Sequence, residues 1–152
     1  MLDNCVNINV ESNRFTANTA FGIYVINGSL RCIFRGNSTI NNGLELIGIT
    51  AGCNDHLVMG NHAYMTGDNG ISVTGDRCRV IGNHCENNWH SGIGIYGSYN
   101  NVSSNTLLSN GRRFVDGDGI NGWAGVKIQP GWNGLGMNNL LVGNIIGDFN
   151  SP

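Results

Sequence analysis

A short phrase recurs along the chain at a nearly constant interval: an apolar residue, two variable residues and an asparagine. The six copies end at Asn13, Asn37, Asn61, Asn83, Asn105 and Asn144. Successive intervals are 24, 24, 22, 22 and 39 residues, so the last holds one repeat plus an insertion of about 17 residues. Such a period is the signature of a repeat protein, in which each unit buries its apolar face only against its neighbours.

A second phrase, glycine followed by an apolar, a variable and an apolar residue, begins at Gly22, Gly43, Gly70, Gly92 and Gly125. Alternating apolar and variable residues are typical of a half-buried β-strand. Helices are disfavoured because glycine and asparagine recur every few residues. The leucine phrase of a leucine-rich repeat is absent, and a β-propeller blade needs about 40 residues. The pattern predicts one all-β domain over residues 1–152, a single-stranded parallel β-helix of about six coils.

The strand assignments follow from the two phrases. The apolar residues of the second phrase should point inward as one stacked column, which would include Leu44 and Leu46 of the copy at Gly43. The repeated asparagine should point inward too, because its amide both donates and accepts and can pair with turn backbone and with the asparagines of neighbouring coils. The alternative is that asparagine is simply a surface turn residue.

Copies such as Gly22-Ile23-Tyr24-Val25 and Val80-Ile81-Gly82-Asn83 resemble the repeats of the pectin lyase-like superfamily of right-handed parallel β-helices. Pectate lyases, polygalacturonases, alginate epimerases and phage tailspike depolymerases belong to it. The resemblance covers residues 5–150 and implies a groove for polysaccharide. The catalytic motifs of these enzymes are absent, so no catalytic set transfers, and the fold alone does not fix a function.

Composition narrows the function classes. Charged residues make up 12% of the chain and the net charge is -2. A nucleic-acid binder needs a basic face, and so does a protein that binds anionic membranes. A nearly neutral chain with few lysines and arginines is therefore a poor candidate for either function. No apolar run is long enough to span a membrane, and no signal peptide is visible. The five cysteines lack metal-binding or disulfide-framework spacing, so we expect buried or free thiols.

The variable positions that should face outward supply the first candidate site residues. Tyr24, Glu45 and Lys127 occupy them in three copies of the second phrase and are candidate substrate-binding residues. Asp68 and His90 should stack about 4.8 Å apart in successive coils, beside Trp89, and could act as a catalytic acid/base pair. A solvated pair on a loop is the alternative. His62 and His84 should also stack, and we expect a structural or surface role for them.

The insertion, residues 111–124, departs most from the repeat. It carries Arg112, Arg113 and Trp123, which suit sugar binding through charge and an aromatic face. Asp116 and Asp118 are candidate general acids of a glycosidase-type mechanism. The alternative is a solvated hairpin. We expect no cofactor and no metal site, since two carboxylates are weak support for calcium.

These features favour a carbohydrate-binding segment of an extracellular or virion protein that degrades polysaccharides, a lyase or a glycoside hydrolase if it is active. The expected partner is a polysaccharide rather than nucleic acid or membrane, and the cations would suit an acidic polysaccharide. No capping helix is visible at either end of the stack, so we expect either a fragment of a longer protein or ends that a homotrimer or end-to-end association covers. The alternative is a purely structural shaft or assembly module.

Overall fold

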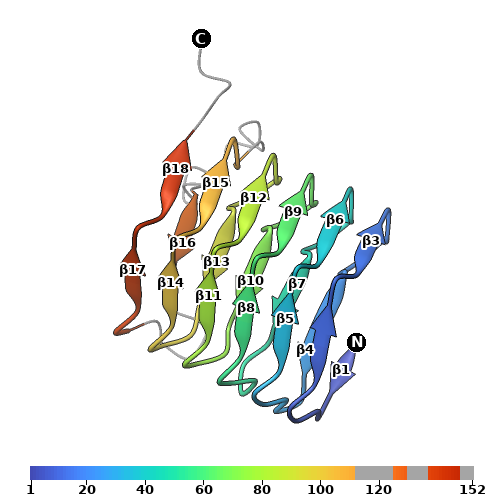
Figure 1. The fold of residues 1–152 in the computed structure, drawn as a ribbon, viewed down its shortest axis with the longest axis vertical. Helices are drawn as coiled ribbons and strands as arrows, with labels where there is room; N and C mark the ends of the chain where they lie inside the picture. The colour runs from blue at the N-terminus through green and yellow to red at the C-terminus, as the bar shows by residue number, and fades with distance from the viewer. Residues whose placement is uncertain (112–124, 130–136, 148–152) are drawn as a thin grey trace.

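The computed structural model describes residues 1–111, 125–129 and 137–147, and the chain winds into three parallel β-sheets. Each coil contributes one short strand to each sheet, and each sheet has six strands (Figure 1). The described residues contain no helix, so none of them forms one able to cross a membrane. The predicted all-β parallel β-helix of about six coils is therefore confirmed.

The strands are two to four residues long. The first sheet holds β1 (Leu2–Asp3), β4 (Ile23–Ile26), β7 (Ile47–Ile49), β10 (Ile71–Val73), β13 (Ile93–Ile95) and β16 (Val126–Ile128). The second sheet holds β2 (Asn9–Glu11), β5 (Ile33–Arg35), β8 (Leu57–Met59), β11 (Arg79–Ile81), β14 (Asn101–Ser103) and β17 (Leu140–Val142). The third sheet holds β3 (Arg14–Thr16), β6 (Ser38–Ile40), β9 (His62–Tyr64), β12 (His84–Glu86), β15 (Thr106–Leu108) and β18 (Ile145–Gly147).

The repeated asparagines form an inward ladder at the bend between the second and third sheets, as predicted. Asn61 is 1% exposed, and its Oδ1 accepts hydrogen bonds from the backbone N (2.9 Å) and Nδ2 (3.1 Å) of Asn37. Its own N and Nδ2 donate in the same way to Asn83 Oδ1, and Nδ2 also donates to the Phe34 carbonyl. The ladder thus satisfies backbone and side-chain groups that would otherwise be buried without partners.

The residue before each ladder asparagine must adopt a left-handed conformation to make the bend. Gly36, Gly60 and Gly82 have φ between +62° and +63°. Glycine has no Cβ to oppose this conformation, which explains why Gly-Asn ends three successive copies of the phrase.

A second ladder, which the sequence analysis did not predict, lines the bend between the third and first sheets. It consists of Asn18, Asn42, Thr66, Asn88 and Asn110. Thr66 is the exception. Its hydroxyl lies 2.8–3.0 Å from three acceptors, Asn88 Oδ1 and the carbonyl oxygens of Asp68 and Asn69, to which it can donate its one proton, and Asn42 Nδ2 has no hydrogen-bond partner.

The apolar core differs from the prediction in one coil. Ile23 and Val25 pair with Ile47 and Ile49, so the strand of that coil is β7, and Gly43-Leu44-Glu45-Leu46 precedes it. The predicted strand at Gly43 is wrong. Leu46 is buried, but Leu44 is only partly buried. In the last coil Ile128 is 41% exposed, so the predicted inward column loses its burial there.

The extra residues before Asn144 are divided between two segments. The offset between paired strands rises from 22 residues at β10–β13 to 33 at β13–β16 and to 39 at β14–β17. Part of the insertion therefore precedes β16 and part follows it, whereas the sequence analysis assigned all of it to residues 111–124. Of that range, only Gly111 lies within the described residues.

All five cysteines are free thiols, four of them are buried, and burial raises the pKa of Cys78 to about 12.

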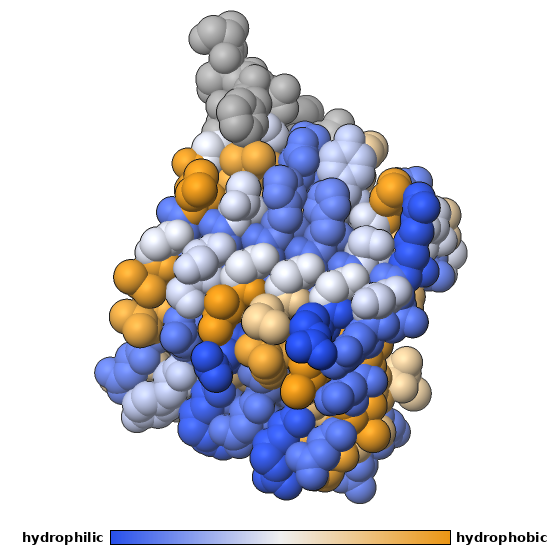
Figure 2. All heavy atoms as spheres, viewed as in Figure 1, coloured by the Kyte–Doolittle hydropathy of each residue, from blue (hydrophilic) through white to orange (hydrophobic). Residues whose placement is uncertain are grey.

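Apolar side chains are exposed on β17 and β18, at the end of the stack, where Figure 2 shows orange spheres along the left edge.

Removing one rung tests the contribution of the asparagine ladder. Asn61→Ala removes the side-chain partner of the Asn37 backbone N and of the Phe34 carbonyl, and each buried unsatisfied group costs about 1–3 kcal/mol. We expect a loss of about 3 kcal/mol in the free energy of unfolding, measured by urea denaturation. Asn13→Ala removes the exposed end rung and should cost less than about 1 kcal/mol. Equal losses would contradict the ladder's role.

Candidate functional site

Polar side chains of three successive coils converge on the outer face of the first sheet. Asp68 lies in the loop before β10, and His90 lies in the corresponding loop before β13. His90 Nδ1 is 2.7 Å from Asp68 Oδ1, so the structure brings together the pair that the period of the repeat placed side by side. Their side chains are 21% and 29% exposed, so solvent reaches both.

Asp68 is held in place by its own loop. Its Oδ1 accepts hydrogen bonds from the backbone N of Asn69 at 2.7 Å and from Asn69 Nδ2 at 3.0 Å. The Thr66 hydroxyl donates to the backbone carbonyl of Asp68. A proton on His90 Nδ1 donates to Asp68 Oδ1, which in the neutral ring leaves the lone pair on Nε2. This is the carboxylate–imidazole arrangement that orients a catalytic base.

Glu45 is the unusual group of this face, because it is only 7% exposed. Burial, and after it the negative charge of Asp68, raise the pKa of its carboxyl to about 7. Hydrogen bonds from Ser72 and Asn69 act in the opposite direction. A carboxyl whose pKa lies near 7 is suited to general acid catalysis at neutral pH.

The prediction that Glu45 is the outward residue of a strand, in line with Tyr24, is wrong. Tyr24 pairs with Gly48, not with Glu45, and Gly48 is the outward residue of β7. Phe21 stacks on Tyr24 with ring centroids 4.2 Å apart, and a Cβ at Gly48 would lie 2.5 Å from Phe21. Glycine at this position therefore lets an aromatic pair lie flat against the sheet.

Tyr96 covers the neighbouring part of the face. A Cβ at Gly94 would lie 3.0 Å from the Tyr96 ring, so the absence of a side chain makes room for it. Burial raises the pKa of the Tyr96 hydroxyl, and Asn69 hydrogen bonds to it. We call Glu45, Asp68, Asn69, Ser72 and His90 the carboxylate cluster, with Tyr96 at its border.

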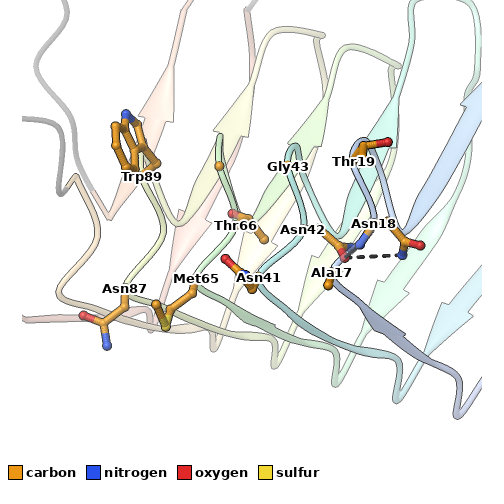
Figure 3. A pocket seen from close by; sticks show the side chains of 11 residues that line it. Ala17, Asn18, Thr19, Asn41, Asn42, Gly43, Met65, Thr66, Asn87 and Trp89 are labelled. Atoms are coloured by element: carbon orange, nitrogen blue, oxygen red, sulfur yellow. Dashed lines mark hydrogen bonds between the residues drawn. The ribbon is translucent and has the colours of Figure 1, made fainter.

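A groove of about 440 Å³ runs along the bend beside this cluster (Figure 3). Its lining includes Asn41, Met65, Asn87 and Trp89, which come from successive coils. Trp89 is 48% exposed and immediately precedes His90 in the chain, so the groove carries an exposed indole one residue away from the carboxylate cluster. Exposed aromatic faces are where sugars commonly stack.

The remaining predicted residues divide into two groups. Lys127 lies on β16, where it pairs with Gly94 of β13, so it shares the outer face with Tyr24. The predicted residues of the insertion lie outside the described residues: Arg112, Arg113, Asp116, Asp118 and Trp123.

Sequence reasoning did not single out Asn69 and Tyr96 as site residues. A signal for both was present. Asn69 directly follows Asp68, and Tyr96 directly follows the β13 phrase, so each stands one residue from a position that the repeat had identified. The repeat could not show that the Tyr96 ring occupies the space left by the missing side chain of Gly94.

Comparison with known proteins identifies the fold family. The family model described as the right-handed β-helix region matches residues 1–147. The chain therefore belongs to the right-handed β-helix family, which fixes the hand of the coil and leaves the activity open. Searches of curated proteins and of solved structures found no significant match.

The buried carboxyl makes stability depend on pH. The pKa of Glu45 rises from 4.5 in the unfolded chain to about 7 in the folded one, so the folded state binds more protons between these values. Stability should fall as pH rises through this window, by about 3 kcal/mol in total. Glu45→Gln should remove this contribution, so that the variant is more stable than the parent at pH 8 and not at pH 4. Parallel stability–pH curves from urea denaturation would contradict the assignment.

Proposed function

We propose that this chain binds a polysaccharide along the outer face of the first sheet, and that the carboxylate cluster cleaves it. The observation that carries the proposal is the buried Glu45, whose pKa is raised to about 7, beside the charged Asp68 paired with His90. A buried carboxyl and a hydrogen-bonded carboxylate–imidazole pair within one site are the basis for assigning an acid and a base.

The roles follow from these environments. Glu45 in its protonated form donates a proton to the glycosidic oxygen as the bond to the leaving sugar breaks. His90, oriented by Asp68, accepts a proton from water in a hydrolase, or from the sugar carbon next to a uronic carboxyl group in a lyase. Tyr24, Trp89 and Lys127 lie on or beside the face and would contact the sugar chain.

The shape of the molecule supports an extended ligand. Equivalent residues of successive coils are about one strand spacing apart, so Tyr24, Ser72 and Lys127 share one outward row that runs across the coils. An acidic polysaccharide as the ligand stays a prediction. The roles of Arg112 and Arg113 in binding it, and of Asp116 and Asp118 in cleaving it, stay predictions as well. The extracellular or virion location stays one too.

A panel of neutral and acidic polysaccharides tests the proposal. We expect the parent chain to release new reducing ends, or unsaturated uronic products with their ultraviolet absorbance if it is a lyase. Glu45→Gln and His90→Gln should each lower the rate by roughly 10²–10⁴-fold, as expected for loss of a general acid or base. The parent rate should fall as pH rises through about 7, where Glu45 loses its proton.

The matched control is Glu11→Gln. Glu11 forms a surface ion pair with Arg35 at 2.9 Å, on the second sheet and away from the cluster, so its loss should leave the rate unchanged. Cleavage that survives in Glu45→Gln would remove Glu45 from the mechanism. Failure of the parent to bind any glycan would favour the structural alternative.

The alternative function, an assembly module, has its own supporting observation. Leu140 and Val142 on β17 and Ile145 and Ile146 on β18 are each more than half exposed, which suits contact with another apolar surface. A homotrimer or end-to-end association would bury them. Light scattering over a range of concentrations tests this, and a monomer at all concentrations would argue against it.

A further inference from the structure

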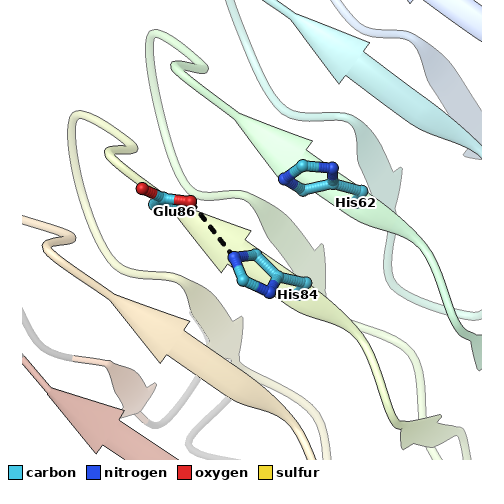
Figure 4. Close-up of side chains that lie close together, drawn as sticks. All are labelled: His62, His84 and Glu86. Carbon is cyan, nitrogen blue, oxygen red and sulfur yellow. Dashed lines mark hydrogen bonds and ion pairs between the residues drawn. The ribbon is translucent and has the colours of Figure 1, made fainter.

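A second group of polar side chains lies on the outer face of the third sheet, apart from the carboxylate cluster. His62 on β9 and His84 on β12 are direct register partners, and Glu86 follows two residues after His84, on the same face of the strand. One ligand atom from each of the three residues lies within 4.8 Å of the others (Figure 4).

We propose that His62, His84 and Glu86 bind a divalent transition-metal ion such as Zn²⁺. Two imidazoles and a carboxylate are among the commonest ligands of zinc, with metal–ligand bonds of roughly 2.0–2.2 Å. Imidazole favours zinc, copper and nickel over magnesium and calcium. Three protein ligands would leave a fourth position for water, as in open zinc sites.

The strands place these ligands so that only small side-chain movements are needed. The rings of His62 and His84 are 4.8 Å apart and nearly perpendicular, and His84 Nε2 lies 3.2 Å from Glu86 Oε2. All three side chains reach solvent, so they can turn toward an ion without disturbing the core. Paired β-strands fix the separation of the Cα atoms, which a loop would not.

Asn87 adds an observation that an ordinary surface ion pair does not require. Its Nδ2 donates to Glu86 Oε1 at 3.2 Å, while Oε2 faces His84. The carboxylate is thereby oriented with one oxygen toward the histidines. Hydrogen bonds that orient a ligand in this way commonly contribute 10- to 100-fold to metal affinity.

The ion would join two successive coils, because His62 and His84 come from different ones. Binding to the folded chain alone raises its stability by mass action. This inference does not rest on the proposed polysaccharide activity, since the two sites share no residue and lie on different sheets.

The test uses the full chain without a polyhistidine tag. Isothermal titration with ZnCl₂ should show one ion bound per chain, and zinc should raise the melting temperature. His62→Gln, His84→Gln and Glu86→Gln should each weaken zinc binding more than Asn87→Ala, for which we expect roughly a 10- to 100-fold loss. Cobalt should give the strong visible absorbance of a low-coordinate site.

His90→Gln serves as the matched control, because it removes a histidine from the other face and should leave zinc affinity unchanged. The free cysteines are the competing source of zinc ligands. Zinc binding that is retained in the double variant His62→Gln/His84→Gln would place the ion on other ligands, such as these thiols, and overturn the proposal. Absence of zinc binding to the parent chain would overturn it as well.

Discussion

The architecture depends on hydrogen bonds that join one coil to the next at the bends. Strand pairing satisfies the backbone inside each sheet, but a bend interrupts the pairing, and buried backbone groups there need other partners. Asparagine supplies them because its side chain carries a donor and an acceptor on one short stem. The Asn37–Asn61–Asn83–Asn105 ladder therefore joins four successive coils at the bend and supports the register that strand pairing sets inside the sheets.

This constraint separates the positions that must be kept from those that can carry function. Inward apolar residues and the rungs of the first ladder repeat from coil to coil, whereas outward residues and the short loop between the second ladder and the first sheet differ from coil to coil. A fixed period then makes spatial neighbours predictable, because residues 22 positions apart stack in these coils. The Asp68–His90 pair could be predicted from the sequence for this reason, and the fold and the inward asparagines could be predicted in the same way.

The register of Glu45 could not be read from the phrase alone. Both Gly43-Leu44-Glu45-Leu46 and Leu46-Ile47-Gly48-Ile49 alternate, and periodicity does not distinguish two overlapping candidates. Counting back from the ladder would have resolved them: Ile23 and Ile47 each stand 14 residues before their asparagine, Asn37 and Asn61. The burial of Glu45 lay beyond sequence reasoning, because it arises from side chains that come together only in the folded stack.

Two departures from the regular pattern meet at the carboxylate cluster. Thr66 replaces an asparagine in the second ladder, which leaves Asn42 Nδ2 without a partner and directs a hydroxyl to the loop of Asp68. Glu45 stands two residues before its strand, where the next two coils place the neutral Asn69 and Ser91. A neutral side chain therefore satisfies the fold at this position, and an ionised carboxyl there destabilises it at neutral pH. Departures that lower stability without serving the architecture are characteristic of functional sites. The two departures are linked through Asp68, whose carbonyl lies beside the Thr66 hydroxyl and whose charge acts on Glu45. Stacking of the described coils gives no reason for an acid at residue 45, whereas the proposed proton transfer to a bound sugar would.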